Sequence, residues 1–378
     1  MKRIRDYGYK IGTMNTGKLN KITDVHGVKV GHQTFAKGDL HTGVTSVFPH
    51  NGNVFKEKVV GATHVINGFG KTVGSIQINE LGTIETPILL TNTFNVGVCS
   101  EALIEYTLKQ NPEIGRTTGT VNPFVGECND MILNDIRAMA LTKEDAHHAL
   151  NKARVDFEEG ATGAGTGMSC FGLKGGIGSS SRIIQYEHGT YTLGVLVLSN
   201  FGQLDQFRID GRDIGKSLKQ QLDVTSEPDK GSIMVVVATD LPVSHRQLRR
   251  VIKRSAAGIS RTGSFYGNGS GDIVIGFSTD NKVPHNSSNG LQSFKAIHED
   301  DINQAFQAVS EATEEAILNS MVTAKTTVGR GGKKIYSLRD FFTDDLTASF
   351  SDCYVKYYGC YDNFFLNYRQ VIKRVTQL

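Results

Sequence analysis

The chain has 378 residues, which is enough to bury a sizeable hydrophobic core. Its formal net charge of +3 and its scattered Lys and Arg residues give no basic stripe, so no nucleic-acid partner is expected. The longest uncharged apolar stretches, such as residues 193–201 and 232–239, have the length of strands and are too short to cross a bilayer. A soluble protein with no membrane partner is expected.

The cysteines and the N-terminus indicate a compartment. The five cysteines include no C-x-x-C pair, and an odd set of this kind fits reduced thiols better than a disulfide framework or a zinc site. Residues 1–6 (MKRIRD) are basic, but the apolar stretch of a secretory signal does not follow them. We therefore expect a cytoplasmic protein.

Strand-like and helix-like segments are mixed along the chain without a strict βαβ rhythm. The strand-like runs are rich in β-branched or aromatic residues and are bounded by Gly, Pro or Asn: 43–48, 86–91, 191–198, 233–239 and 272–278. The helix-like runs carry apolar residues at helical spacing: 100–109, 142–157, 244–259 and 300–324. A hairpin is expected where residues 182–186 turn into the strand that begins at Tyr191. The mixture predicts a layered α+β or α/β domain with helices covering sheets.

The chain divides into one domain and a tail. No internal repeat or low-complexity linker interrupts residues 1–334, which we interpret as a single domain. Residues 335–378 are crowded with aromatic side chains and end in a basic run. Such a C-terminal extension must bury its rings, and we expect it to pack on a neighbouring subunit or to cover the mouth of the site.

The most informative stretch is residues 267–272 (GNGSGD), because it places Ser270 in flexible backbone directly before an apolar run. Gly269 has no Cβ, so the hydroxyl of Ser270 can attack the Gly269 carbonyl. Hydrolysis of the resulting ester would leave a new chain that begins at Ser270, whose free α-amine can act as the base for its own hydroxyl. The alternative is an ordinary glycine-rich turn that enters a strand.

Other motifs are weaker. Residues 67–72 (NGFGKT) end like a phosphate-binding loop, but the required first glycine falls at Val65. Residues 160–167 (GATGAGTG) have no clean strand before them and no helix start after them, so a close-packed loop is favoured over a dinucleotide site. The histidines include no H-E-x-x-H motif, and His147 and His148 are interpreted as a solvated or partly packed pair. No cofactor and no metal are expected.

Polar residues near the ends of apolar segments are further candidates. Asn200 stands where a long apolar strand ends, and its amide can donate to a developing oxyanion or simply cap a turn. Thr313 lies on the apolar face of the helix-like run 300–324 and Glu315 lies two positions on, so a hydroxyl and a carboxylate can line a polar pocket at the edge of that face. Glu311 and Glu314 are expected at the solvated surface.

Several separated stretches match one family together. In chain order they are residues 22–32, 86–93, 128–130, 133–137, 163–182, 197–202, 238–242, 261–264 and 269–272. Each is weak by itself, but jointly they are specific, and the chain resembles the L-aminopeptidase/D-esterase family of self-processing aminopeptidases, which includes the β-aminopeptidases.

The resemblance implies an αββα sandwich similar to that of N-terminal-nucleophile hydrolases, with its own strand connectivity. It implies autocleavage between Gly269 and Ser270 into chains 1–269 and 270–378, with Ser270 as the N-terminal nucleophile. The family's oxyanion asparagine maps to Asn200, and the hydroxyl and glutamate that support the nucleophile map to Thr313 and Glu315. The implied substrate is a small peptide, amide or ester with a free amino terminus, and the implied assembly is a homo-oligomer of processed pairs.

The sequence departs from the family's pattern and leaves alternatives open. Lys71 stands where an acidic residue is expected, and Met131 and Ile132 stand where some members carry an aromatic hydroxyl that assists the oxyanion. One alternative to the aminopeptidase is an amidase or acyltransferase with the same Ser270 intermediate, which differs from it only in the molecule that accepts the acyl group. An uncleaved, non-catalytic relative that binds a small amino-terminated ligand is a further hypothesis, against which the intact Gly269–Ser270 pair argues. Whether the substrate carries an α-L, β or D residue depends on the shape of the pocket.

Overall fold

The computed structural model describes residues 1–222, 231–287 and 290–342. By its internal contacts the chain separates into residues 1–337 and 338–378, and the second part begins with a short 3-10 helix at Leu338–Phe341. The predicted domain boundary between residues 334 and 335 stays a prediction. Most of the predicted aromatic extension, residues 343–378, lies outside the described residues. The fold below is that of residues 1–337.

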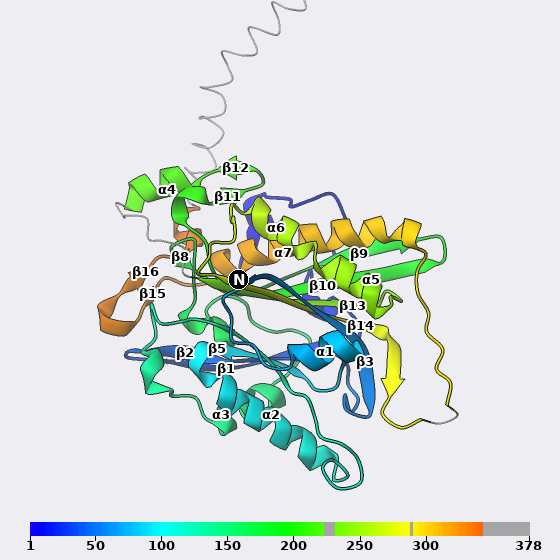
Figure 1. Ribbon diagram of the computed structural model, residues 1–378. Helices are drawn as coiled ribbons and strands as arrows, with labels where there is room; N and C mark the ends of the chain where they lie inside the picture. The colour runs from blue at the N-terminus through cyan, green and yellow to red at the C-terminus, as the bar shows by residue number, and fades with distance from the viewer. Residues whose placement is uncertain (223–230, 288–289, 343–378) are drawn as a thin grey trace, which may run out of the picture. The chain divides into compact units, whose positions relative to one another are not determined.

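Two β-sheets form the centre of the fold (Figure 1). The first is four-stranded, in the order β1 (Lys29–Lys37), β2 (Leu40–Phe48), β5 (Ile88–Asn92) and β6 (Phe124–Cys128). The second is six-stranded, in the order β4 (Thr83–Ile84), β3 (Glu57–Gly68), β14 (Gly271–Pro284), β13 (Ser232–Thr239), β10 (Gly189–Asn200) and β9 (Gly176–Tyr186). Short ribbons pair β7 (Ser169–Cys170) with β8 (Leu173–Lys174), β11 (Arg208–Ile209) with β12 (Arg212–Asp213), and β15 (Thr327–Val328) with β16 (Lys334–Ile335).

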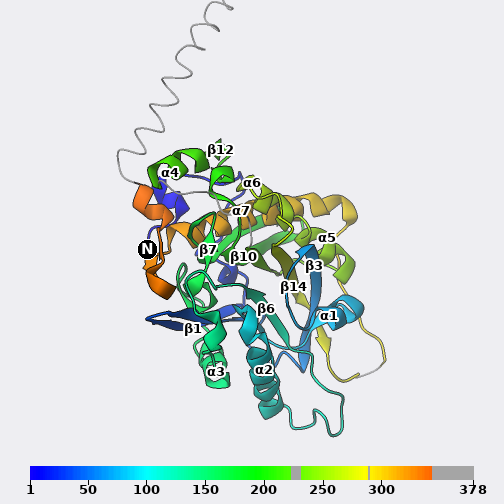
Figure 2. The ribbon, with the colours of Figure 1, turned by 60° about the vertical axis from the view of Figure 1, so that its left-hand side comes forward.

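Helices cover the outer faces of both sheets, as Figures 1 and 2 show. The layer over the six-stranded sheet holds α5 (His245–Ile252), α6 (Ser255–Arg261) and α7 (Asn303–Val322). The layer over the four-stranded sheet holds α2 (Val96–Gln110) and α3 (Lys143–Asn151). Two shorter helices, α1 (Ser75–Leu81) and α4 (Gly215–Leu222), lie outside these layers. The order of layers is helix, sheet, sheet, helix, which is the predicted αββα sandwich.

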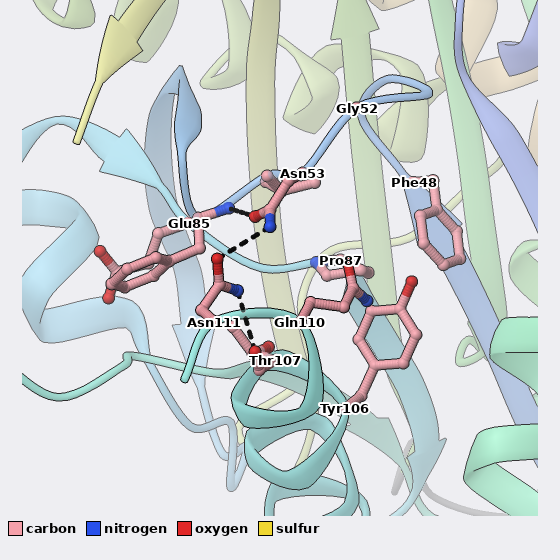
Figure 3. Close-up of a pocket in the computed structure, with 11 residues that line it drawn as sticks. Phe48, Gly52, Asn53, Glu85, Pro87, Tyr106, Thr107, Gln110 and Asn111 are labelled. Atoms are coloured by element: carbon pink, nitrogen blue, oxygen red, sulfur yellow. Dashed lines mark hydrogen bonds between the residues drawn. The ribbon is translucent and has the colours of Figure 1, made fainter. Parts of the chain in front are cut away.

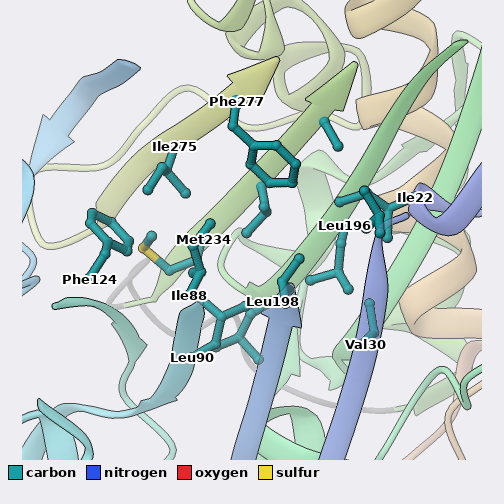
Figure 4. Packing of buried hydrophobic residues seen from close by; sticks show 14 of the residues in the cluster. Ile22, Val30, Ile88, Leu90, Phe124, Leu196, Leu198, Met234, Ile275 and Phe277 are labelled. Carbon is teal, nitrogen blue, oxygen red and sulfur yellow. The ribbon is translucent and has the colours of Figure 1, made fainter. Parts of the chain in front are cut away.

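The main hydrophobic core lies between the two sheets (Figure 4). Alternate residues of β13, among them Met234 and Val236, point into this core. Val235 and Val237 are also buried and point to the other face of the sheet, because successive side chains of a strand alternate. Both faces of the six-stranded sheet are covered, so residues 233–238 of β13 are apolar on both faces. The core residues labelled in Figure 4 are Ile22, Val30, Ile88, Leu90, Phe124, Leu196, Leu198, Met234, Ile275 and Phe277.

The predicted strands and the predicted hairpin between β9 and β10 are confirmed. One helix prediction was too long, and another missed a break. The run 142–157 is helical only to Asn151, because Arg154 instead exchanges two backbone hydrogen bonds of 3.0 Å with Val30 of β1. The run 244–259 forms two helices, α5 and α6, with a turn at Lys253 and Arg254 between them.

Candidate active site

The predicted nucleophile and the predicted oxyanion donor lie at the same end of the six-stranded sheet. Asn200, the last residue of β10, lies opposite Ser232, the first residue of β13. Ser232 in turn lies opposite Gly271, the first residue of β14. Because neighbouring strands are about 4.8 Å apart, the Cα atoms of Asn200 and Gly271 are about 10 Å apart. The sheet therefore places Ser270, which precedes β14, and Asn200 at the same edge, with β13 between their strands.

The backbone around Ser270 is a turn held by Asn67 of β3. The N–H of Ser270 donates to the carbonyl of Gly267 over 2.9 Å. The side-chain amide of Asn67 donates to the carbonyls of Gly267 at 3.1 Å and Asn268 at 3.3 Å, and also to the carbonyl of Ser270. These contacts fix the peptide groups on both sides of the Gly269–Ser270 bond.

The NGFGKT stretch, residues 67–72, is part of the wall around this turn. A Cβ on Gly271 would lie 2.7 Å from the carbonyl oxygen of Phe69, closer than real Cβ atoms approach. Glycine is therefore required where β14 begins against the chain that leaves β3. The stretch that resembled a phosphate-binding loop supports the Ser270 turn through Asn67 and Phe69.

The hydroxyl of Ser270 has a carboxylate partner. Ser270 is 1% exposed, and its Oγ donates to Oδ1 of Asp272 over 2.8 Å. The two residues are two positions apart at the start of a strand, a spacing that puts both side chains on one face. A carboxylate at this distance is within reach to accept the hydroxyl proton. Sequence reasoning missed Asp272, although the i, i+2 spacing before an apolar strand was the available signal.

The amide of Asn200 is held in one orientation by two backbone groups. Its Oδ1 accepts a hydrogen bond of 2.9 Å from the N–H of Ser169, and its Nδ2 donates one of 2.9 Å to the carbonyl of Asn129. The residue is buried, with 4% of its surface exposed. A strand end thus holds an amide firmly, as expected, while the role of Asn200 as an oxyanion donor stays a prediction.

Thr313 and Glu315 lie in the buried middle of α7. The Thr313 hydroxyl donates to the Val309 carbonyl of the preceding helical turn over 2.7 Å. Glu315 accepts hydrogen bonds from Arg5, Arg182 and Asn20. Within the described part of the chain, no hydrogen bond links either residue to Ser270. Their predicted support of the nucleophile is untested, and these contacts favour an indirect role.

The electrostatics of Glu315 fit a structural ion pair. Burial by itself would raise the pKa of this carboxyl, but the hydrogen bond from Arg5 and the charges of Arg182 and Arg5 hold the pKa below its usual value. Arg182 and Glu315 have fully buried side chains, with Nη2 and Oε2 2.8 Å apart. Glu315 is therefore ionised, and both of its oxygens are occupied.

The prediction that Glu311 and Glu314 are solvated was wrong. They are 3% and 5% exposed, because α7 is enclosed by its neighbours along most of its length. Glu311 pairs with Arg182 at 3.0 Å, and the nearest cation to Glu314 is Arg261 at 3.6 Å. Burial raises the pKa of Glu314 to about 7.

A second carboxylate that sequence reasoning missed lies beside the start of β14. Glu127 of β6 is 3% exposed and accepts the N–H of Lys71 over 2.9 Å and the hydroxyl of Thr93. A Cβ on Gly70 would lie 3.7 Å from Glu127 Oε1 and 3.8 Å from Gly271 Cα, so Gly70 lies between the carboxylate and β14. Lys71 stands where the family's pattern has an acidic residue. Its backbone N–H contacts Glu127, and its Nζ lies 4.1 Å from the centroid of the Phe69 ring.

A small cavity elsewhere in the fold belongs to packing. Figure 3 shows the space between α2 and the segment after β2, where Asn53 donates to Asn111 over 2.8 Å and Asn111 to the Thr107 carbonyl over 2.9 Å. Its volume of about 10 Å³ is room for about one water molecule. In the ranges that the structure describes, no group of three or more His, Cys, Asp or Glu residues is arranged to hold a metal ion. None of the helices in those ranges is long and apolar enough to cross a membrane.

Comparison with known proteins identifies the family. Residues 20–335 match the model of peptidase family S58. The beta-peptidyl aminopeptidase BapA of Sphingosinicella microcystinivorans is 35% identical over 359 residues, which cover 89% of each chain. The PH0078 protein of Pyrococcus horikoshii OT3, which has a crystal structure, is 47% identical in sequence. The TM-score between the two structures is 0.86, over 90% of this chain and 98% of that one.

A further solved structure connects the fold to a class of hydrolase. The L-aminopeptidase D-Ala-esterase/amidase of Ochrobactrum anthropi, described as a prototype of the serine aminopeptidases and a new variant of the Ntn-hydrolase fold, is 32% identical. Its TM-score is 0.83, over 89% of this chain and 95% of that one. The chain belongs to peptidase family S58. The predicted family resemblance and fold class are confirmed, and the predicted aminopeptidase function agrees with these relatives.

Proposed function

We propose that this protein is a self-processing serine aminopeptidase that removes N-terminal residues from peptides, amides or esters through an acyl-enzyme on Ser270. The observation that carries the proposal is the 2.8 Å hydrogen bond from the Ser270 hydroxyl to Asp272, directly after a turn that Asn67 fixes. Membership of a peptidase family supports the hydrolase class, and the names of the relatives support aminopeptidase activity.

The first reaction is cleavage of the chain itself. Asp272 accepts the proton of Ser270 Oγ while the oxygen attacks the carbonyl carbon of Gly269. The bond between that carbon and the Ser270 nitrogen breaks, the nitrogen takes up a proton, and an ester joins Gly269 to Ser270 Oγ. Water hydrolyses the ester, which leaves a carboxylate on Gly269 and a free α-amine on Ser270.

Turnover then uses the new N-terminus. An α-amine has a pKa near 8, so a useful fraction is unprotonated at neutral pH and can accept the Ser270 hydroxyl proton. Oγ attacks the carbonyl of the substrate, the amide hydrogen of Asn200 stabilises the oxyanion, and the proton passes to the departing amine. Water attacks the acyl-enzyme, releases the acid and restores Ser270.

Glu127 explains a preference for a free amino terminus. Its buried carboxylate is held by Thr93 and by the backbone of Lys71, on the other side of Gly70 from the start of β14. A substrate ammonium group placed against it would lie next to Gly70 and the start of β14, the strand that Ser270 precedes. An internal peptide segment carries no such charge, so the carboxylate favours exopeptidase over endopeptidase action.

Three further features belong to the same proposal. Thr313 and Glu315 support the site through the packing of α7 rather than by touching the Ser270 hydroxyl. The processed pairs assemble into a homo-oligomer, as the family resemblance implies. The protein works in the cytoplasm, which suits the buried, reduced thiols of Cys99, Cys128 and Cys170.

Two substrates that differ only in acetylation of the amino group test the aminopeptidase assignment. The substrate with the free amino group should be hydrolysed. Glu127→Gln should raise the KM for that substrate about 10- to 100-fold, since a hydrogen bond to a charged group contributes about 1.5–3 kcal/mol. Equal rates on the acetylated substrate would instead indicate a general amidase. Preferential transfer of the acyl group to an added amine would indicate an acyltransferase.

A further inference from the structure

Lys174 is a buried lysine that the proposed reaction leaves unused. The side chain, on β8, is 0% exposed. Its ammonium group donates to the carbonyls of Gly165 at 3.0 Å, Met168 at 2.8 Å and Gly175 at 2.7 Å. These bonds use all three of its donors, so the charge is held in one place by the backbone.

One peptide group connects Lys174 to Asn200. The ammonium binds the carbonyl of Met168, and the N–H of the same peptide, on Ser169, donates to Asn200 Oδ1 over 2.9 Å. Hydrogen bonds in a low-dielectric interior polarise one another along a chain. The positive charge of the ammonium group, placed at the carbonyl oxygen of Met168, therefore makes the N–H of Ser169 a stronger donor. The stronger bond at Oδ1 in turn makes the hydrogens on Nδ2 of Asn200 stronger donors.

The same contacts decide which way the amide points. Oδ1 faces the N–H of Ser169, and Nδ2 gives one of its two hydrogens to the carbonyl of Asn129 over 2.9 Å. A flipped amide would set Oδ1 against the Asn129 carbonyl and Nδ2 against the Ser169 N–H, with repulsion at both ends. The amide is thus held with its second Nδ2 hydrogen available for an oxyanion.

We propose that Lys174 is a positioning residue of the hydrolytic site, which fixes and polarises the Asn200 amide through the Met168–Ser169 peptide. This inference rests on the proposed function, because it assumes that Asn200 stabilises the oxyanion. It adds a role for the lysine in the stretch 163–182, which sequence reasoning used only as a family marker. Lys174 touches no reacting atom and acts through Asn200.

A double-mutant cycle tests the proposal on the full-length enzyme. Loss of an oxyanion donor costs about 10²- to 10³-fold in kcat, so Asn200→Ala should fall in that range. Lys174→Met should lower kcat about 10-fold and leave KM within about twofold, because polarising the donor is worth less than the donor itself. In the double variant the Lys174 substitution should cost nothing further, since its route runs through Asn200.

The controls separate this inference from the proposed function. Leu103→Ala removes a buried side chain of the distant α2 core. Compared with Lys174→Met at an equal loss of stability, it should leave kcat unchanged. If Lys174→Met lowers kcat equally in the wild-type and the Asn200→Ala backgrounds, or does not lower kcat at all, the positioning role is overturned and the proposed function stays intact. Full activity in both Asn200→Ala and Ser270→Ala would overturn the proposed function, and this inference with it.

A measurement without the Lys174 substitution covers the case in which that variant does not fold. Burial lowers the pKa of Lys174 to about 7. In the Ser270→Ala chain labelled with ¹⁵N-asparagine, the Asn200 Nδ2 resonance, assigned by its loss in Asn200→Asp, should therefore shift between pH 6 and pH 8.5. A resonance that does not move over that range would overturn the proposal.

The neighbouring ionisable groups must be separated from Lys174 in that experiment. Asp130 and Cys170 act electrostatically on Lys174, and Lys174 acts on His41. Burial raises the pKa of Asp130 to about 6, whereas it lowers the pKa of His41. The shift should persist in His41→Gln, and it should persist at a lower pH in Asp130→Asn, because the Asp130 charge raises the pKa of Lys174. A shift that disappears with either substitution would assign it to that group and contradict the role of Lys174.

Discussion

A serine hydroxyl becomes a nucleophile only where its proton has an acceptor and its surroundings allow a close approach. Both conditions meet at Ser270, where the hydroxyl is bonded to Asp272 and the preceding residue is Gly269. The turn is held from outside by Asn67, 203 positions away from Ser270 in the sequence. The residues that would make this bond reactive in the proposed mechanism are thus partly local and partly brought in by β3.

Asp272→Asn should slow cleavage between Gly269 and Ser270 by at least about 10-fold, because an amide cannot accept the hydroxyl proton; general-base assistance is typically worth 10² to 10⁴. The fraction of cleaved chain followed over time on a denaturing gel measures the effect. Asp280→Asn, an exposed carboxylate in the same strand, is the matched control and should process normally. Wild-type cleavage kinetics in Asp272→Asn would remove Asp272 from the mechanism.

Local pattern was sufficient to single out Ser270 and Asn200, because a glycine-flanked serine and a strand-terminal amide are visible in a few consecutive residues. It was insufficient for Glu127, whose relation to the site depends on how β6 meets the segment after β3. It was also insufficient for the ion partners of Glu315, because Arg5 and Arg182 reach it from distant parts of the chain. Contacts of this range follow from packing, not from spacing.

Glu314 should make stability depend on pH. Its pKa is raised by burial from an ordinary value of 4.5 to about 7, so between these values the unfolded chain releases a proton that the folded chain keeps. The free energy of unfolding therefore falls as the pH rises from about 4.5 to about 7.

Glu314→Gln removes that penalty. In the Ser270→Ala background it should be more stable than its parent at pH 8 by up to about 2 kcal/mol, and the difference should vanish near pH 4.5. Urea unfolding at both pH values measures it, with Glu101→Gln on the surface of α2 as the control. An equal difference at both pH values would contradict the assignment.

At the scale of elements, α7 packs on β9 through a glycine contact and a buried ion network. A Cβ on Gly178 would lie 2.0 Å from the carbonyl of Ala316, so the helix backbone lies directly on the strand. Arg182 of β9 reaches Glu311 and Glu315 of α7 at 3.0 and 2.8 Å. The long helix is therefore fixed to an edge strand by backbone contact and by charge together.

Arg182→Met should destabilise the fold by about 3–5 kcal/mol, because it leaves two buried carboxylates without their shared cation. Arg246→Met breaks an exposed pair with Glu299 and should cost less than about 1 kcal/mol. Denaturant unfolding of both variants in the Ser270→Ala background gives the comparison. Similar losses in the two variants would show that the buried network is no stronger than a surface pair.

The sequence predicted the types of these elements better than their ends. Periodicity extends without a break from Ser244 to Ile259, yet the chain turns at Lys253 so that α6 can pack on α7, where Gly258 sits against the carbonyl of Ser310. Glu311 and Glu314 were predicted at the solvated surface because charged side chains usually lie there. Burial of α7 on several sides, which pairs Glu311 with Arg182, is a property of the assembled layers.

At the scale of the whole domain, the sandwich gathers the ends of strands from both sheets. Ser270 precedes β14, Asn200 ends β10, and Glu127 and Asn129 lie at the end of β6 in the other sheet. The parallel pairing of β13 with β14 starts both strands at the same edge, next to the end of the antiparallel β10. The layer order was predictable from the family resemblance, whereas this convergence required the strand register.

The intact mass of the purified wild-type protein, measured beside that of Ser270→Ala, shows whether Ser270 cleaves its own chain. We expect the wild type to separate into two chains, residues 1–269 and 270–378, while the variant remains a single chain. A wild type that remains whole, or a variant that is still cleaved at the same bond, would contradict Ser270 as the self-processing nucleophile.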